Sequence, residues 1–340
     1  MRIGLTCDLK EKVPVSQNHP IDALEEYDSR ETVDAIAAVL SSLGHSPVYL
    51  GGGIEFLTSV VWEKVDFVFN ISEGLGVYRS REAQVPGVLE MLDIPYTGSD
   101  PQCLAICLDK PLTKQLVAAA GIATPKWRVI SSEKQLKQMN WGDFPFPAFV
   151  KPIHEGSSKG VRLASRVEHA KDITKMAGNL LEYYRQPVIV EEFMSGDELT
   201  VGMVGNAPTR IVGIMRILPK TNKADFVYSL EVKRDWEKLV EYECPAKFED
   251  SVTEKIRNAS TRIFEVLGCR DFARIDFRLS SDGTPNFLEI NPLPGLNPNY
   301  SDLIIMNRMM GNSYESLISS ILNAALERCS HVPKESHRHL

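Results

Sequence analysis

Two alternating segments in the last quarter of the chain gather acidic, amide and guanidinium side chains. The first segment, FARIDFRL, carries Arg274 and Asp276. The second, FLEINPLPG, carries Glu289 and Asn291, and the turn sequence SSDG lies shortly before it. Both segments have the pattern of β-strands joined as a hairpin, in which alternate side chains share a face. Three oxygen donors and one guanidinium therefore converge on one face.

This donor set is typical of a magnesium site. Asp276, Glu289 and Asn291 offer hard oxygen ligands, and magnesium takes its remaining ligands from water and nucleotide phosphates. The alternative is an exposed hairpin with ordinary surface charges. We favour the metal site because charged side chains between apolar neighbours such as Ile275 and Ile290 are costly without a partner.

A second segment, FVKPIHEGSSKGV, runs from an apolar strand ending at Lys151 into a loop of glycine and serine. The backbone N–H groups and hydroxyls of such a loop can wrap a phosphate, although EGSSKG alone is equally compatible with a flexible connection. The sequence has no GxxxxGK[ST] pattern and no GxGxxG after its first strand. The P-loop and dinucleotide-binding patterns are therefore excluded.

The third segment, VIVEEFMSGDELTV, has the pattern of a strand, a short linker and another strand. Linkers of this kind can offer backbone amides and carbonyls to the edge of an adenine ring. Taken singly, Glu191, Glu192 and Glu198 are expected to be solvated carboxylates. Taken with the lysine loop and the acidic hairpin, they complete a candidate nucleotide site.

The elements that must position these segments begin with an alternation of strand and helix. Strands are expected at Arg2 to Cys7, Ser46 to Leu50 and Val65 to Ile71, and a helix at Thr32 to Leu43. Such alternation predicts a parallel sheet. Residues 10–18 and 72–82 are polar and follow the first and third strands, where open α/β sheets place ligand-binding loops.

Beyond residue 100 the pattern becomes a mixture of helices and strands. A helix is expected before it at 86–92, and further helices at 101–107, 111–120, 249–267 and 313–327. Strands are expected at 126–130, 148–151, 160–164, 187–194, 199–204, 210–215 and 272–279. The fold class is therefore predicted to be α/β with an α+β C-terminal part. We expect units at 1–100, 101–186 and 187–330, followed by a tail at 331–340.

Composition narrows the function classes. The 340 residues are 43% hydrophobic and 24% charged, which excludes disordered and fibrous chains. A net charge of −7 argues against nucleic acid and anionic membranes as partners. The six cysteines form no CxxC pair, so reduced thiols are expected, with Cys103 and Cys107 as buried small side chains. Since no signal-peptide pattern and no run of 18 apolar residues occurs, a cytoplasmic protein is expected.

With these three segments in this order and spacing, the chain resembles the ATP-grasp superfamily, and most closely the D-alanine–D-alanine ligase family, over nearly its whole length. The segment YTGS at 96–99, followed by Asp109 and Lys110, is also similar to that family. The resemblance implies a three-domain ATP-grasp fold. Its parts would be a Rossmann-like N-terminal domain that binds substrate, a central lid domain and a C-terminal catalytic domain.

The resemblance also implies roles for individual residues, with ATP and magnesium as cofactors. Two magnesium ions are expected, and manganese would substitute for them. The implied ATP-binding residues are Lys110, Lys151, Glu155, Gly156, Ser157, Ser158, Glu191, Glu192, Phe193, Met194, Glu198 and Lys233. The implied catalytic groups are Arg274, the backbone N–H of Gly295, Ser157 and Lys233, and the implied metal ligands are Asp276, Glu289 and Asn291.

The family's chemistry is the joining of a carboxylate to an amine. The γ-phosphoryl group passes to a substrate carboxylate, and an amine then displaces phosphate from the acyl phosphate. The resemblance implies amino acids as substrates and a homodimer as the assembly. Three hypotheses follow: a divergent D-alanine–D-alanine ligase, an ATP-grasp ligase for other amino acids or small acids, and a nucleotide-binding regulatory protein without turnover. The complete acidic set with Arg274 argues against the last.

The substrate-binding positions depart from the family pattern. Ser72-Glu73-Gly74 stands where the family has a His-Gly pair, and Ser80 to Ala83 stands where it has Gly-Glu-Asp-Gly. The early glutamate that grips the first substrate's amino group corresponds to Glu26 or Glu31. Arg234 replaces a common tyrosine, and Asn297 to Tyr300 replaces a run of serine and histidine. The identity of both substrates therefore stays open.

Overall fold

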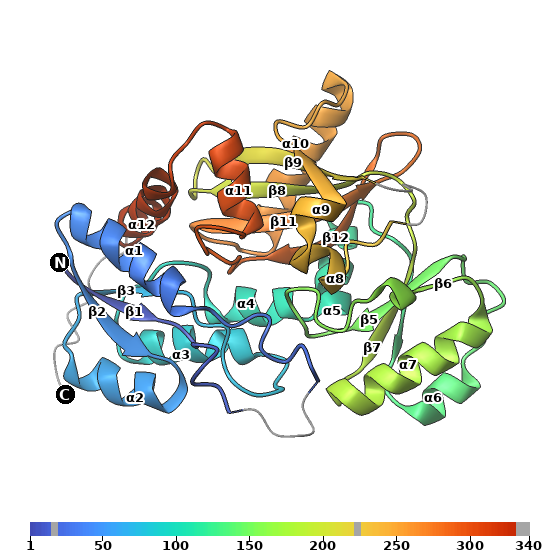
Figure 1. Ribbon diagram of the computed structural model, residues 1–340, viewed down its shortest axis with the longest axis horizontal. Helices are drawn as coiled ribbons and strands as arrows, with labels where there is room; N and C mark the ends of the chain where they lie inside the picture. Colours follow the sequence, from blue (N-terminus) through green and yellow to red (C-terminus); the bar gives the residue numbers. More distant parts are fainter. Residues whose placement is uncertain (15–19, 221–225, 331–340) are drawn as a thin grey trace.

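Three sheets lie in chain order in the computed structural model, which describes residues 1–14, 20–220 and 226–330. The predicted tail, part of the polar segment 10–18 and residues 221–225 fall outside these residues. The first sheet occupies the part of the chain coloured blue in Figure 1, the second lies beside α6 and α7, and the third lies beneath α10 and α11. The predicted α/β class with an α+β C-terminal part is confirmed.

The N-terminal sheet has the order β2-β1-β3 and is parallel, as the alternating pattern predicts. Its strands are β1 (Arg2–Thr6), β2 (Ser46–Gly51) and β3 (Phe67–Asn70), and its helices are α1 (Arg30–Ser42), α2 (Gly53–Trp62) and α3 (Gln84–Met91). Helix α1 buries Val33, Ile36 and Leu40, which recur at helical spacing. A 3-10 turn at Arg81–Ala83 directly precedes α3.

The two short helices that follow are α4 (Pro101–Leu108) and α5 (Lys110–Ala119). Each begins with an aspartate as N-cap: Asp100 accepts a hydrogen bond from the Cys103 N–H, and Asp109 accepts one from the Leu112 N–H. Each also has a proline in its first turn, where no N–H partner is needed. These caps fix Lys110 at the start of α5, facing the later sheets.

The central sheet has the order β4-β7-β5-β6, and all its pairs are antiparallel. Its strands are β4 (Trp127–Ile130), β5 (Ala148–Pro152), β6 (Arg166–Val167) and β7 (Val188–Glu192), with helices α6 (Glu133–Gln138) and α7 (Ala170–Tyr184). Figure 1 shows both helices on the outer side of this sheet. Because β7 pairs with β4 and β5, the central sheet extends past the division expected at residue 186.

The C-terminal sheet has the order β10-β9-β8-β11-β12 and is antiparallel. Its strands are β8 (Glu198–Val204), β9 (Arg210–Pro219), β10 (Val240–Glu243), β11 (Phe272–Leu279) and β12 (Pro285–Asn291). Its helices are α8 (Leu230–Arg234), α9 (Trp236–Leu239), α10 (Asp250–Val266), α11 (Asp302–Met309) and α12 (Tyr314–Ser330). Helix α12 returns to the first unit and lies beside α1 (Figure 1), so one apolar core joins the two ends of the described chain.

Several expected elements differ from the structure. The strand expected at 160–164 is wrong: Gly160 has a φ of +74°, its N–H bonds the Asp22 carboxylate, and a 3-10 turn occupies Leu163–Ser165. The left-handed backbone and this polar contact keep the segment out of the sheet. Helices α2, α6, α7 and α11 were not expected from the sequence. None of the described helices is long and apolar enough to span a membrane.

Candidate active site

The acidic hairpin has the register that its alternation predicts. On β11 and β12, Arg274 lies opposite Asn291 and Asp276 lies opposite Glu289. Between these pairs, Ile275 and Ile290 face the opposite side and are buried in the core. The hairpin thus presents a guanidinium, two carboxylates and an amide on one surface, as the sequence analysis expected.

Asp276 is bound on three sides. Arg274 donates to it from Nε at 3.1 Å and from Nη2 at 2.9 Å, and the Thr200 hydroxyl donates at 2.6 Å. Arg274 also lies 3.4 Å from Asp302 on α11. Burial alone would lower the pKa of Arg274, but Asp276 and Asp302 raise it. The guanidinium is therefore a permanent cation held at a fixed place.

Glu289 is the carboxylate that two lysines share. Its Oε2 lies 3.6 Å from Lys110 Nζ and 3.8 Å from Lys151 Nζ, and about a quarter of its side chain is exposed. Burial would raise the pKa of Glu289, but Lys110, Lys151 and Lys233 lower it to about 2. Glu289 is thus ionised at neutral pH and keeps two phosphate-binding candidates close together.

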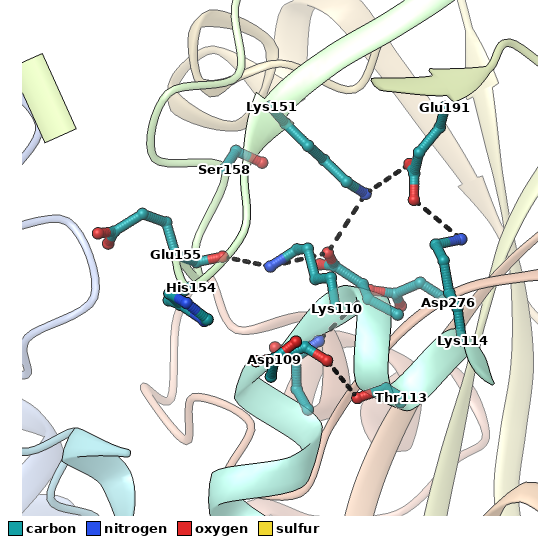
Figure 2. A network of polar contacts seen from close by, with 12 residues as sticks. Asp109, Lys110, Thr113, Lys114, Lys151, His154, Glu155, Ser158, Glu191 and Asp276 are labelled. Atoms are coloured by element: carbon teal, nitrogen blue, oxygen red, sulfur yellow. Dashed lines mark hydrogen bonds and ion pairs between the residues drawn. The ribbon is translucent and has the colours of Figure 1, made fainter. Parts of the chain in front are cut away.

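Glu191 lies between two lysine amines, as Figure 2 shows. Its two oxygens are each 2.9 Å from an amine, one on Lys114 and one on Lys151. The Glu191 side chain is 3% exposed, so it is not the solvated carboxylate expected for this position taken alone. Burial would raise its pKa, but the two lysines lower it. This carboxylate therefore positions Lys151, and it also lines the cavity described next, where the contact with ATP implied by the resemblance stays a prediction.

A cavity with an empty volume of about 930 Å³, part of it open to solvent, lies between the central and C-terminal sheets. One end is apolar, formed by Phe149, Met194, Leu199, Ile217 and Leu288, and the other end is charged, formed by Lys110, Lys151, Lys233, Arg274, Asp276 and Glu289. Glu192, Phe193, Glu198, Glu155 and Ser158 line the same cavity. The apolar side chains suit the base of a nucleoside triphosphate, and the cluster of cations suits its phosphates.

Arg278 organises the apolar end and was missed from the sequence. It bonds Glu198 at 2.7 Å and the Phe226 carbonyl at 2.7 Å, and it also donates to the Met194 carbonyl. Its guanidinium lies 4.7 Å from the centre of the Phe193 ring. A single arginine thus fixes the linker and Glu198, the acid that the resemblance assigns to the ribose.

The loop that follows β5 is fastened to the N-terminal unit. Lys159 lies 2.9 Å from Glu26 and also pairs with Glu155. Arg81 donates to Glu26 at 2.8 Å and to the His154 carbonyl at 2.7 Å. Burial would raise the pKa of Glu26, but Arg81 and Lys159 lower it. These buried ion pairs hold the loop over the site.

Ser157 and Ser158 sit at the tip of that loop. Their φ angles are +50° and +59°, which serine adopts rarely. Ser158 lines the nucleotide-shaped cavity, whereas Gly156 and Ser157 line a second cavity beside it. The two serines therefore face different chambers, a division that the GSS pattern alone does not reveal.

The second cavity has an empty volume of about 610 Å³. Residues 290–295 after the hairpin, including Asn291 and Gly295, form one wall, and Glu73 and Glu82 from the N-terminal unit form another. Lys110, Glu155, Lys233, Arg274 and Glu289 line both cavities. A phosphoryl group held among these five side chains would therefore reach a molecule in the second cavity.

Other positions singled out near the substrates lie elsewhere. Arg234 pairs with Glu25, and Asn299 donates to Glu31 at 2.7 Å. Asn297 is buried and bonds Thr32 at 3.1 Å, and Tyr300 is half exposed. None of these described residues lines either of the two cavities.

A third thiol lies beside Cys103 and Cys107, the two cysteines that the sequence analysis expected to be buried. Cys269 Sγ lies 3.6 Å from Cys103 Sγ, which lies 3.9 Å from Cys107 Sγ. The contact comes from a turn 166 residues away along the chain, so spacing alone gives no sign of it. All three side chains are buried in the same apolar core, as expected for Cys103 and Cys107.

The comparisons with known proteins agree with this geometry. The family model described as D-ala D-ala ligase C-terminus matches residues 116–323. A D-alanine–D-alanine ligase of Aquifex aeolicus is 35% identical over 88% of this chain and 96% of its own length. The uncharacterized protein y4sG of Sinorhizobium fredii is 32% identical over 87% of each chain.

Solved structures share the fold. D-alanine–D-alanine ligase from Bacillus anthracis complexed with ATP has a TM-score of 0.73 and 23% identity, covering 97% of this chain and 99% of that one. The VanG D-Ala:D-Ser ligase of Enterococcus faecalis has a TM-score of 0.71 and 20% identity, covering 95% and 99%. The architecture is thus the three-domain ATP-grasp fold. Given the sequence matches above, the chain belongs to the D-alanine–D-alanine ligase family.

Proposed function

We propose that this protein is an ATP-dependent carboxylate–amine ligase that forms D-alanyl-D-alanine, a precursor dipeptide of peptidoglycan, through an acyl phosphate. The observation that carries the proposal is the pair of adjoining cavities that share Lys110, Glu155, Lys233, Arg274 and Glu289. Apolar and cationic side chains line the first cavity, as binding of ATP requires, and the lining of the second is mainly polar. The cations that line both cavities, Lys110, Lys233 and Arg274, lie where a phosphoryl group would pass from the first cavity to the second.

In this proposal the lysines and the magnesium ligands of the acidic hairpin together offset the negative charge of the triphosphate. Lys110, Lys151 and Lys233 offset negative charge as the γ-phosphoryl group moves to the substrate carboxylate. Glu191 and Glu289 hold Lys151 in place, so little reorganisation is needed during the transfer. Lys151 and Glu191 come from the central sheet, Glu289 comes from β12 of the C-terminal sheet, and Lys110 comes from the start of α5.

Magnesium fits the hairpin in this proposal. Asp276, Glu289 and Asn291 carry oxygen atoms on one face. Asp276 accepts there from Thr200 and Arg274, and from the Asn291 amide at 3.5 Å. Magnesium held by these three side chains would offset the negative charge of the nucleotide phosphates. Two ions, with manganese as a substitute, are expected from the family.

The second half of the reaction falls to Arg274 and Gly295. The attack of an amine on the acyl phosphate places negative charge on the former carbonyl oxygen. Arg274 and the backbone N–H of Gly295 border the cavity where that charge forms, so they are suited to stabilise it. Ser157 on the loop tip and Lys233 on α8 border the same chamber and exclude water from it.

A ligase joining other amino acids is the second candidate. It is favoured by Glu73 and Glu82 in the second cavity and by the ion pair of Arg234, because these positions depart from the family pattern. A nucleotide-binding protein without turnover is less consistent with a complete set of acids, lysines and Arg274. A homodimer and a cytoplasmic location belong to the main proposal, and light scattering tests the assembly.

The experiment is an ADP-release assay with magnesium and ATP against a panel of D- and L-amino acids and small carboxylates, with mass spectrometry of the product. D-alanine as the sole amino acid, yielding its dipeptide, supports the main proposal. No ADP release with D-alanine, together with a product from other acids, supports the second candidate. Asp276→Ala and Glu289→Ala should each abolish ADP release, and full activity in both variants would refute the metal assignment.

A further inference from the structure

Three of the six cysteine thiols meet where α4 lies beside the turn that follows α10. Cys103 and Cys107 lie four residues apart on α4, so one turn of helix puts their side chains on the same face. Cys269 comes just after α10 and is far from both in the sequence. The sulfur atoms of all three lie within 4.8 Å of one another, and every side chain is buried. The three thiols therefore form one cluster.

The turn that carries Cys269 is fixed to the beginning of α4. Gly268 has a φ of +69°, which turns the chain at the end of α10. The N–H of Arg270 donates to the Ser99 hydroxyl at 3.0 Å, and the Arg270 guanidinium lies 2.6 Å from Asp100, the N-cap of α4. The backbone around the thiols thus holds them together, so a ligand would meet a site that is already formed.

The distances between the sulfur atoms fit a single bound ion. An ion that binds thiolates at about 2.3 Å in tetrahedral directions holds neighbouring sulfur atoms about 3.8 Å apart. Cys103 Sγ lies 3.6 Å from Cys269 Sγ and 3.9 Å from Cys107 Sγ. All three are free thiols, so each sulfur is available as a ligand.

The surroundings favour an ion that needs three ligands and leaves no net charge. Among the residues that the structure describes, no histidine, aspartate or glutamate completes a fourth position in the cluster. The thiols belong to an apolar core, and the nearby Asp100 is negative and already paired with Arg270.

The charge of the complex then decides between ions. Three thiolates around zinc leave one negative charge and an open fourth position, and around monovalent copper they leave two negative charges. Trivalent arsenic forms three bonds to sulfur, and its complex with three thiolates is neutral. Such a complex avoids the cost of burying a charge in the apolar core.

The second cavity gives the cluster a route to solvent. Cys107 lines this cavity, together with Leu108 and Lys110, which follow it in the chain. A small solute in the cavity therefore meets one thiol in the wall, with the other two sulfur atoms within 4.8 Å of it.

We propose that Cys103, Cys107 and Cys269 form a binding site for a soft, three-coordinate ion, with trivalent arsenic as its occupant. Arsenous acid, As(OH)3, exchanges its three hydroxyl groups for three thiolates. Three S–H and three As–O bonds break, three As–S and three O–H bonds form, and three water molecules leave. Arsenic stays trivalent, so no oxidant or reductant is needed. The bound ion would join α4 to the turn after α10, and its binding does not depend on the ligase function.

The test measures arsenite binding to the full chain by equilibrium dialysis, with the arsenic quantified by mass spectrometry. The variants are Cys103→Ala, Cys107→Ala and Cys269→Ala. Cys7→Ala is the matched control, because Cys7 is also fully buried but lies in the N-terminal unit, 4.0 Å from the Tyr49 hydroxyl.

The wild type and Cys7→Ala should each bind one arsenic per chain. Each cluster variant should bind at least about 100-fold more weakly, since even the residues that support metal ligands contribute about 10- to 100-fold to affinity. Undiminished binding in the three cluster variants, or no binding by the wild type, would overturn the proposal.

A second measurement does not depend on the folding of the variants. X-ray absorption at the arsenic edge of the wild-type complex should show three sulfur neighbours and no oxygen neighbour, and an excess of zinc should leave the arsenic in place. At 100 times the Kd, arsenite should raise the unfolding temperature of the wild type by about 5–10 °C. Oxygen neighbours at the arsenic, or its displacement by zinc, would overturn the assignment of a neutral complex with three thiolates.

Discussion

Glu82→Gln should make the protein more stable at neutral and alkaline pH. Burial raises the folded-state pKa of this carboxyl from 4.5 to about 7. Between these two values the folded state holds a proton that the unfolded state has released, so the free energy of unfolding falls as pH rises. A shift of about 2.5 pKa units, at 1.36 kcal/mol per unit, corresponds to about 3 kcal/mol above pH 7. Glutamine has nearly the same shape and does not titrate, so it removes this cost.

The assay is thermal unfolding of the wild type and of Glu82→Gln from pH 4 to 8.5, with Glu133→Gln, at an exposed position on α6, as control. With about 2–4 °C of Tm per kcal/mol for a large unit, Glu82→Gln should unfold about 6–12 °C above the wild type at pH 8. The gap should close as pH falls through 7 toward 4.5. A variant that unfolds below the wild type at pH 8 would show that Glu82 has a stabilising partner, and the reasoning would fail.

Four further changes have expected outcomes. Lys114→Met leaves buried Glu191 with one lysine and should lower the free energy of unfolding by about 3–5 kcal/mol, measured by denaturant titration; an unchanged midpoint would contradict the buried pair. Arg278→Met should raise the KM for ATP by about tenfold or more, and Arg278→Lys less, in steady-state kinetics. Gly156→Ala should impair turnover while leaving the unfolding temperature within about 2 °C, because its Cβ would meet only Glu26 Oε2, at 3.7 Å. Chelating magnesium should stop ADP release, and readdition should restore it.

The acidic hairpin was predictable because its information is local. The alternation of Arg274 and Asp276 fixes their common face, and a short turn brings β12 alongside in register. Helices α4 and α5 were likewise predicted within a residue or two, since their proline and aspartate caps lie in the sequence itself. The roles drawn from the family, by contrast, stay predictions that the experiments above will test.

The buried ion pairs were not predictable, because their partners are remote. Lys159 meets Glu26 across 133 positions, and Arg278 meets Glu198 across 80. Neither partner carries a local signal that separates it from a solvated charge. The expected strand at 160–164 fails for the same reason, since Asp22, 138 positions away, takes the Gly160 N–H. Charge pairing between distant segments is decided by the packing of the units and not by a pattern in either one.

The buried ion pairs that join Lys159 and Arg81 to Glu26 affect the order of events in a catalytic cycle. The loop over the site belongs to the central unit, while Glu26 and Arg81 belong to the N-terminal unit. Lifting that loop away from the first unit separates buried opposite charges, which is costly until water reaches them. We therefore expect nucleotide exchange and product release to share one opening step, and we expect the rate of that step to limit turnover.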